Sequence, residues 1–149
     1  MYDTFVTPSE EQAARLVVAT RAGAGRWGGS SSPRWPAPGA LRSTALDMLR
    51  FLAANLDPAS TPLAAQLERI QRPPAPAGPG NGRRARLADR PPARPARAML
   101  WHNGGTNGFR SFVGVIRDAG IAVVVLGNTA RSVDWLGLRL VRALATGAG

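Results

Sequence analysis

Apolar positions in the second half of the chain predict three antiparallel strands. Residues 121–126 are apolar at every position, which a strand tolerates only when both of its faces are covered, so this strand is expected to be central. Residues 109–116 form a second strand-like run, and the Gly-containing segment 118–120 between the two runs is typical of a hairpin loop. Residues 99–101 begin a third strand, which is expected to end in the polar, glycine-rich turn 102–109.

Apolar residues spaced three and four apart predict helices on both sides of these strands. One helix, capped by Ser43 or Thr44 and ending before Pro58, has an apolar stripe of Leu46, Leu49, Leu52, Ala53 and Leu56. A shorter helix starts at Thr61-Pro62 and ends before Pro73, and its apolar residues Leu63, Leu67 and Ile70 are expected to face one way. The last helix, capped by Ser132, is expected to lie across one face of the sheet with Val133, Leu136, Leu140, Val141 and Leu144.

The N-terminal third carries weaker signals. Residues 9–12 have the spacing of a capping box that starts a short helix, and residues 16–20 resemble a strand, although a continued helix fits them too. Residues 21–39 are rich in Gly, Ser and Pro and predict a surface loop, in which Trp27 and Trp35 either flank a cleft or pin the loop to the body.

These elements together predict an α+β fold, an α/β sandwich fragment. Its antiparallel sheet is expected to carry the C-terminal helix on one face and the helices from the middle of the chain on the other side. Residues 1–149 fit a single partial domain, interrupted by a low-complexity Arg/Pro/Gly loop at residues 72–97 in which Leu87 is the lone large aliphatic residue.

The charge of the chain, +10 with a pI near 11.9, raises the question of nucleic acid. The arginines are spread from Arg15 to Arg142, and no helix-turn-helix, zinc-finger or RNA-recognition pattern accompanies them. No apolar run is long enough to cross a bilayer. We therefore expect no nucleic acid and no membrane as partners; the compartment is unknown, since the absence of cysteine says little about it.

One segment resembles a known family. His102-Asn103-Gly104-Gly105-Thr106-Asn107-Gly108-Phe109 is similar to the third motif of the serine β-lactamase and penicillin-binding-protein superfamily, in the His-x-Gly-x-Thr-x-Gly-Phe form of the class C-like β-lactamase-related hydrolases, esterases and D-aminopeptidases. Residues 38–48 are similar to that family's Gly-Leu-x-Ser-Thr-Ala-x-Asp-Met helix start, and the resemblance extends forwards to residues 126–128. The resemblance covers the chain from about Thr4 to the C-terminus.

The resemblance implies roles for the motif. His102 stands where the family has Lys or His, as a cation or proton carrier beside the nucleophile, and the N–H of Gly105 would be one of two oxyanion-hole donors. The remaining residues would contact substrate or shape the turn: Asn103, Gly104, Thr106 and Asn107. Without the resemblance, His102 is a partly buried strand-end histidine packed on Trp101. The family implies no cofactor, and one His with no Cys cannot supply a zinc site.

Two further motifs of the family are not found in this sequence. Its nucleophile lies in Ser-x-x-Lys, where the lysine activates the serine, and the 149 residues contain no lysine. The general base usually lies in Tyr-x-Asn or Ser-x-Asn, and the single tyrosine is in Tyr2-Asp3-Thr4. Arginine stays protonated and cannot replace the lysine as a base.

Two hypotheses follow from these observations. One is the C-terminal portion of a serine hydrolase that acylates a serine with an amide, ester or β-lactam substrate, inactive alone and paired with a missing N-terminal half. The other is a non-enzymatic Arg-rich module that binds an anionic partner, which salt-dependent DNA binding would support.

Overall fold

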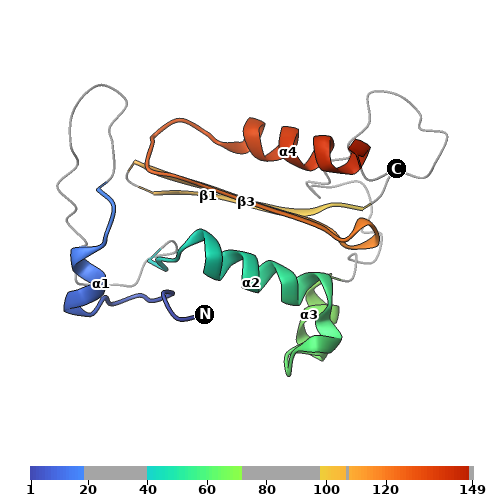
Figure 1. Cartoon of the computed structure of the whole chain (residues 1–149), viewed down its shortest axis with the longest axis horizontal. Coiled ribbons are helices and arrows are strands. Elements are labelled where there is room, and N and C mark those ends of the chain that lie inside the picture. Colours follow the sequence, from blue (N-terminus) through green and yellow to red (C-terminus); the bar gives the residue numbers. More distant parts are fainter. Residues whose placement is uncertain (19–39, 72–97, 107, 148–149) are drawn as a thin grey trace, which may run out of the picture.

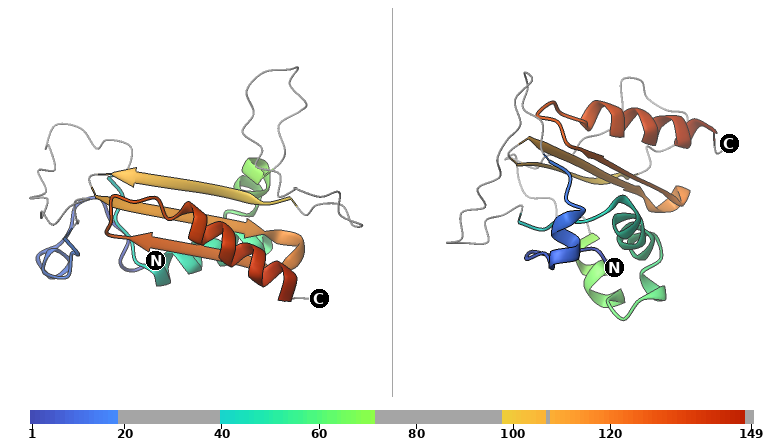
Figure 2. Two further views of the ribbon diagram at one scale, coloured as in Figure 1. Left: turned by 90° about the horizontal axis from the view of Figure 1, so that it is seen from above. Right: turned by 60° about the vertical axis from the view of Figure 1, so that its left-hand side comes forward.

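Three antiparallel strands lie between α4 on one face and α2 on the other (Figure 1). The strands of this computed structural model, which describes residues 1–18, 40–71, 98–106 and 108–147, are β1 (Leu100–Thr106), β2 (Phe109–Ile116) and β3 (Ile121–Gly127). Their order is β1-β2-β3. The α+β sandwich predicted from the sequence is confirmed, with the C-terminal helix packed on the sheet (Figure 2).

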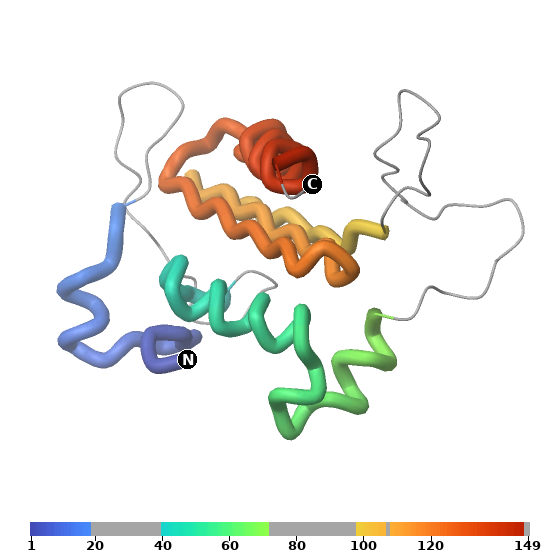
Figure 3. The backbone as a smooth tube through the Cα atoms, turned by 45° about the vertical axis from the view of Figure 1, so that its right-hand side comes forward, coloured from blue at the N-terminus to red at the C-terminus, as the bar shows by residue number. Residues whose placement is uncertain are grey.

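Within the described residues β2 is the middle strand, so the expectation that residues 121–126 form the central strand is wrong. The apolar run of β3 is explained by its two covered faces, because α4 contacts β3 on one side and α2 contacts it on the other (Figure 3). The predicted hairpin is confirmed. Its loop is the 3-10 turn η2 (Arg117–Ala119), followed by Gly120 in the left-handed region with φ 64°.

The side of the sheet beneath α4 (Asp134–Gly147) holds the largest cluster of buried side chains. Phe112 is its fully buried centre, and the ring of Trp101 stacks on it with ring centroids 5.8 Å apart. Ser132 caps the helix as predicted, because its Oγ accepts a hydrogen bond from the N–H of Asp134 at 3.1 Å.

The face of α4 that meets the sheet agrees with only part of the predicted stripe. The buried or half-buried positions include Val133, Leu136 and Val141, as predicted, together with Asp134, Gly137, Leu138 and Ala145. Leu140 and Leu144 were predicted to face the sheet, but they are 40% and 49% exposed. The helix is rotated because Gly137, which has no side chain, lies directly against the Phe112 ring and brings the helix backbone close to the sheet.

This rotation predicts opposite outcomes for two truncations on α4. Val141→Ala removes fully buried methyl groups and is expected to lower the free energy of unfolding by about 2 kcal/mol. Leu144→Ala removes a half-exposed side chain and is expected to cost less than about 1 kcal/mol. Urea titrations of both variants test the assignment, and a larger loss at Leu144 would restore the predicted stripe.

The other face of the sheet carries α2 (Ala45–Leu56), followed by the 3-10 turn η1 (Pro58–Ser60) and α3 (Ala64–Gln71). Thr44 caps α2 by accepting from the N–H of Asp47 at 3.2 Å, and α3 begins two residues later than Thr61-Pro62 predicted. The predicted stripe of α2 is wrong at Leu46, Leu49 and Ala53, which are exposed. The buried positions are Asp47, Leu52 and Asn55.

Asp47 is buried because the N-terminal segment folds over it. Its carboxylate accepts hydrogen bonds from the N–H of Tyr2 (3.2 Å) and Asp3 (2.7 Å), from the Thr4 hydroxyl (2.9 Å) and from Arg50 (2.8 Å). Burial alone would raise the pKa of Asp47, but these four donors lower it to about 2.

The N-terminal helix α1 (Glu10–Ala14) has the predicted capping box, with Ser9 Oγ accepting from the N–H of Gln12 and the Gln12 side chain accepting from the N–H of Ser9. Residues 16–18, predicted as the start of a strand, lie in no helix or strand, since α1 ends in a turn at Arg15. The predicted loops at 21–39 and 72–97 lie outside the described residues. Among the described helices, none has the length and apolarity that crossing a membrane requires.

Candidate active site

The histidine motif lies in an extended strand and not in a turn. β1 continues through Thr106, so His102, Asn103, Gly104 and Gly105 are strand residues, and the predicted turn is confined to the two positions before Phe109. Gly108 supplies the positive φ of that turn, at 83°. Asn107 lies outside the described residues.

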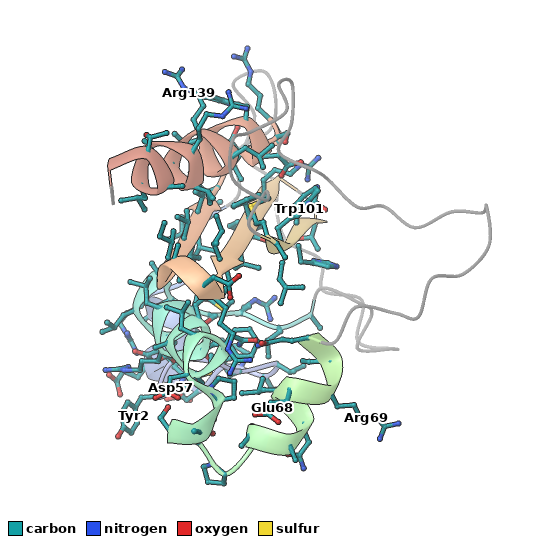
Figure 4. All side chains as sticks on the ribbon, turned by 90° about the vertical axis from the view of Figure 1, so that its right-hand side faces the viewer. Tyr2, Asp57, Glu68, Arg69, Trp101 and Arg139 are labelled. Carbon is teal, nitrogen blue, oxygen red and sulfur yellow. The ribbon has the colours of Figure 1, made fainter. Side chains whose placement is uncertain are left out.

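The alternation of a strand divides the motif between two faces of the sheet. Trp101 and Asn103 face α4, because the Trp101 ring stacks on Phe112 and the Asn103 amide donates to the Asp134 carboxylate at 2.8 Å; Figure 4 shows Trp101 at the sheet beneath α4. His102 faces the opposite side, where it lines a groove with residues of α2 and α3. The resemblance placed His102 and Asn103 in one site, but in the structure their side chains lie on opposite faces of β1.

The backbone of β1 offers hydrogen-bond donors at the outer edge of the described sheet. Thr106 pairs with Phe109 across a two-residue turn, and such a closing pair is hydrogen-bonded. Because bonded and non-bonded pairs alternate along an antiparallel ladder, we infer that His102 and Gly104 bond to β2 while the N–H of Gly105 points outward. This is the orientation that an oxyanion-hole donor needs.

A polar hollow of about 270 Å³ adjoins Gly105 on the α4 side, and we call it the Arg110 hollow. It is lined by Asn103, Gly104, Gly105, Arg110, Ser132 and Asp134. Asp134 is the first residue of α4, so its carboxylate lies at the positive end of the helix dipole, and it holds Asn103 in place. Asn103, expected to contact substrate, is thus already bonded to a side chain of the protein.

Arg110 is a site residue that the sequence reasoning did not single out. It pairs with Gly105 across the β1–β2 ladder, and a Cβ added to Gly105 would lie 2.7 Å from its Nη1. The guanidinium donates to the carbonyls of Phe109 (2.9 Å) and Thr106 (3.4 Å), which hold it over the strand. A fixed positive charge beside an outward amide is suited to stabilising a negative oxygen.

The glycines of the motif make room for these neighbours. A Cβ at Gly104 would lie 2.7 Å from the hydroxyl oxygen of Ser111, and a Cβ at Gly105 would meet Arg110. Both contacts are to side chains that can rotate, and neither glycine has a positive φ. The glycines therefore leave space for the Ser111 and Arg110 side chains over β1, and the backbone conformation itself does not require glycine. Among the described residues, no three His, Asp or Glu side chains gather in a way that could hold a metal ion.

One edge of the antiparallel sheet thus brings together the N–H of Gly105, the guanidinium of Arg110 and a polar hollow. The family model described as Beta-lactamase matches residues 1–146, and this chain belongs to that family. No curated protein and no solved structure matched the chain.

Proposed function

We propose that this chain forms the oxyanion-binding and substrate-binding side of a serine hydrolase site, whose nucleophile is supplied by a polypeptide segment outside these 149 residues. The observation that carries the proposal is the register of β1 on β2, from which the N–H of Gly105 is inferred to point outward, next to the guanidinium of Arg110. Membership of the Beta-lactamase family gives the reaction class, hydrolysis through a serine, at the level of the family.

In the proposed reaction a serine hydroxyl attacks the carbonyl carbon of an amide, ester or β-lactam, and the carbonyl oxygen becomes negative. The N–H of Gly105 would donate to that oxygen, and Arg110 would add a favourable charge beside it. His102 would carry a proton for the attacking serine or the leaving group, since a neutral imidazole can accept one and an imidazolium can donate one. Water would then hydrolyse the acyl-enzyme.

The chain alone is proposed to be inactive because it contains no lysine to activate a serine. We expect no covalent labelling when the purified chain is incubated with a fluorescent penicillin or with a fluorophosphonate esterase probe. Mass spectrometry of intact protein and of its peptides checks this expectation. Acylation of any serine of this chain would contradict it.

The complementary expectation concerns a second polypeptide that carries Ser-x-x-Lys. Co-expression of this chain with N-terminal halves of β-lactamase family members is expected to yield a complex that the same probes label on the added serine. Gly105→Pro removes the outward N–H without removing a ladder hydrogen bond and is expected to slow labelling by about 100-fold or more. Gly105→Ala adds a Cβ at the same place but keeps the N–H, so it is the matched control and should slow labelling much less than Gly105→Pro.

A further inference from the structure

A second hollow lies on the opposite side of β1 from the Arg110 hollow. We call it the β1 groove, with a volume of about 340 Å³. It exists because α2 packs mainly on β3 and β2, which leaves the α2-facing side of β1 uncovered. Its lining comes from four elements, α2, α3, β1 and β2.

The walls of the β1 groove are apolar. Phe51 and Leu52 of α2 form one wall, Ile70 of α3 forms the rim, and Leu100 and Val113 form the sheet side. Phe51, Leu100 and Ile70 remain 41%, 42% and 69% exposed, so the groove presents apolar surface to solvent. No charged side chain lines it among the described residues, apart from the titratable His102 at its mouth.

The polar groups in the groove already have partners. The amide of Gln71 donates to the backbone and side-chain oxygens of Asn55, at 3.1 and 3.0 Å. Asn55 donates to the carbonyl of Phe51 at 2.8 Å, and Arg117 donates to Gln71 at 3.4 Å. The side-chain N–H groups of Asn55 and Gln71 therefore already donate to oxygens of the protein. An apolar ligand can bind beside them without leaving either amide without a hydrogen-bond acceptor.

We propose that the β1 groove binds an uncharged aryl or alkyl group of the substrate, so that the substrate is an ester or amide with an extended apolar arm. This inference rests on the proposed function and extends it to a substrate class. His102 at the mouth and Gly105 further along β1 are three residues apart, a distance of about 10 Å along a strand. The apolar arm must therefore span about that length between the groove and the reacting carbonyl.

The size of the groove agrees with a small ligand. Small-molecule sites range from about 300 to 1,000 Å³, and the groove lies near the lower limit, which suits one ring or a short alkyl chain. A carboxylate in the groove would lose water, and among the described residues no Arg or Lys side chain lines the groove to offset that loss, His102 being the one group there that can carry a positive charge. The groove thus favours a neutral group over the carboxylate of a typical anionic substrate.

Binding to this chain alone tests the proposal, because the groove needs no nucleophile. Titration of the ¹⁵N-labelled chain with 4-phenylbutanamide, followed by amide chemical shifts, is expected to move signals of residues 51–55, 70–71, 100–102 and 113–115. In a series of alkyl amides, each added methylene is expected to tighten Kd about fourfold until the groove is full. 4-Phenylbutanoate is expected to bind more weakly than the amide.

Two variants of similar exposure separate the groove from general surface binding. Ile70→Glu places a charge on the rim and is expected to weaken binding about threefold or more. Leu63→Glu changes an equally apolar residue, 56% exposed, that does not line the groove, and is expected to leave Kd unchanged. Because both positions are exposed, both variants should keep the wild-type spectrum.

Several results would overturn the inference: no saturable shifts, shifts spread over the whole chain, equal effects of the two variants, or tighter binding of the carboxylate. Such results would leave the proposed function standing, since that depends on labelling of an assembled site. Conversely, saturable binding with no labelling of any assembled complex would remove the proposed function and reduce the groove to a ligand site without chemistry.

Discussion

Replacing Gly137 with alanine is expected to lower stability more than the same replacement at any other glycine that the structure describes. A Cβ at Gly137 would fall well inside van der Waals contact of the Phe112 ring, which is fully buried and cannot turn away without opening the core. The cost is expected to be about 3 kcal/mol or more, a large part of the stability of a domain of this size. Thermal unfolding followed by circular dichroism measures it.

Two controls make this expectation specific. Gly147→Ala adds the same methyl group to the same helix where nothing lies within 4 Å, and it is expected to be neutral or slightly stabilising. Phe112→Leu frees space beneath α4, so the double variant Gly137→Ala/Phe112→Leu should lose less than the two single losses added together. If Gly137→Ala unfolds at the wild-type temperature, the close approach of α4 to β2 is wrong.

Replacing Asp47 is expected to release the N-terminal segment from α2. Asp47→Ala leaves the N–H groups of Tyr2 and Asp3 without their acceptor and should lower the midpoint of thermal unfolding by several degrees. Asp47→Asn keeps the shape but loses the charge that Arg50 contacts and replaces one accepting oxygen with an NH2 group. The remaining oxygen can still accept two of the four hydrogen bonds, so a smaller loss than in Asp47→Ala is expected. Asp118→Asn, at an exposed turn, is the matched control and should unfold like the wild type.

The same carboxylate predicts how stability depends on pH. The pKa of Asp47 is lowered from an ordinary value near 3.8 to about 2 in the folded chain, so the unfolded chain binds its proton first. The stabilisation is therefore complete above about pH 4 and is lost as pH falls toward 2. The hydrogen bond from Arg15 lowers the pKa of Asp3 and acts in the same direction. Urea midpoints measured between pH 5 and 2 should fall less steeply in Asp47→Asn than in wild type.

The strands, the hairpin and the position of the last helix could be predicted from the sequence because their signals are local. The apolar run of β3, the Gly120 turn and the Ser132 cap each lie within a few residues of the structure that they specify. The faces of α2 and α4 could be predicted only in part, because a hydrophobic pattern identifies apolar side chains such as Leu52 and Val141 but not a buried glycine or a buried aspartate. In this chain a glycine meets Phe112, and a buried aspartate is satisfied by residues more than forty positions away.

The candidate site divides in the same way. The motif was recognisable from its residues, and its strand follows from the pairing with β2. The resemblance did not reveal that Asn103 is held by Asp134, that Arg110 lies over Gly105, or that His102 faces the other side of the sheet. These contacts depend on the register between β1 and β2 and on the residue at which α4 begins. Neither can be predicted from a short stretch of sequence.

Amide hydrogen exchange along β1 tests the central claim most directly, because the proposed site depends on which N–H groups face the outer edge. In the ¹⁵N-labelled chain, the N–H groups of His102 and Gly104 are expected to exchange slowly, and those of Asn103 and Gly105 to exchange fast. Slow exchange at Gly105 together with fast exchange at Gly104 would show that the N–H of Gly105 bonds to β2, and this would contradict the proposed site. Fast exchange at all four positions would contradict it too.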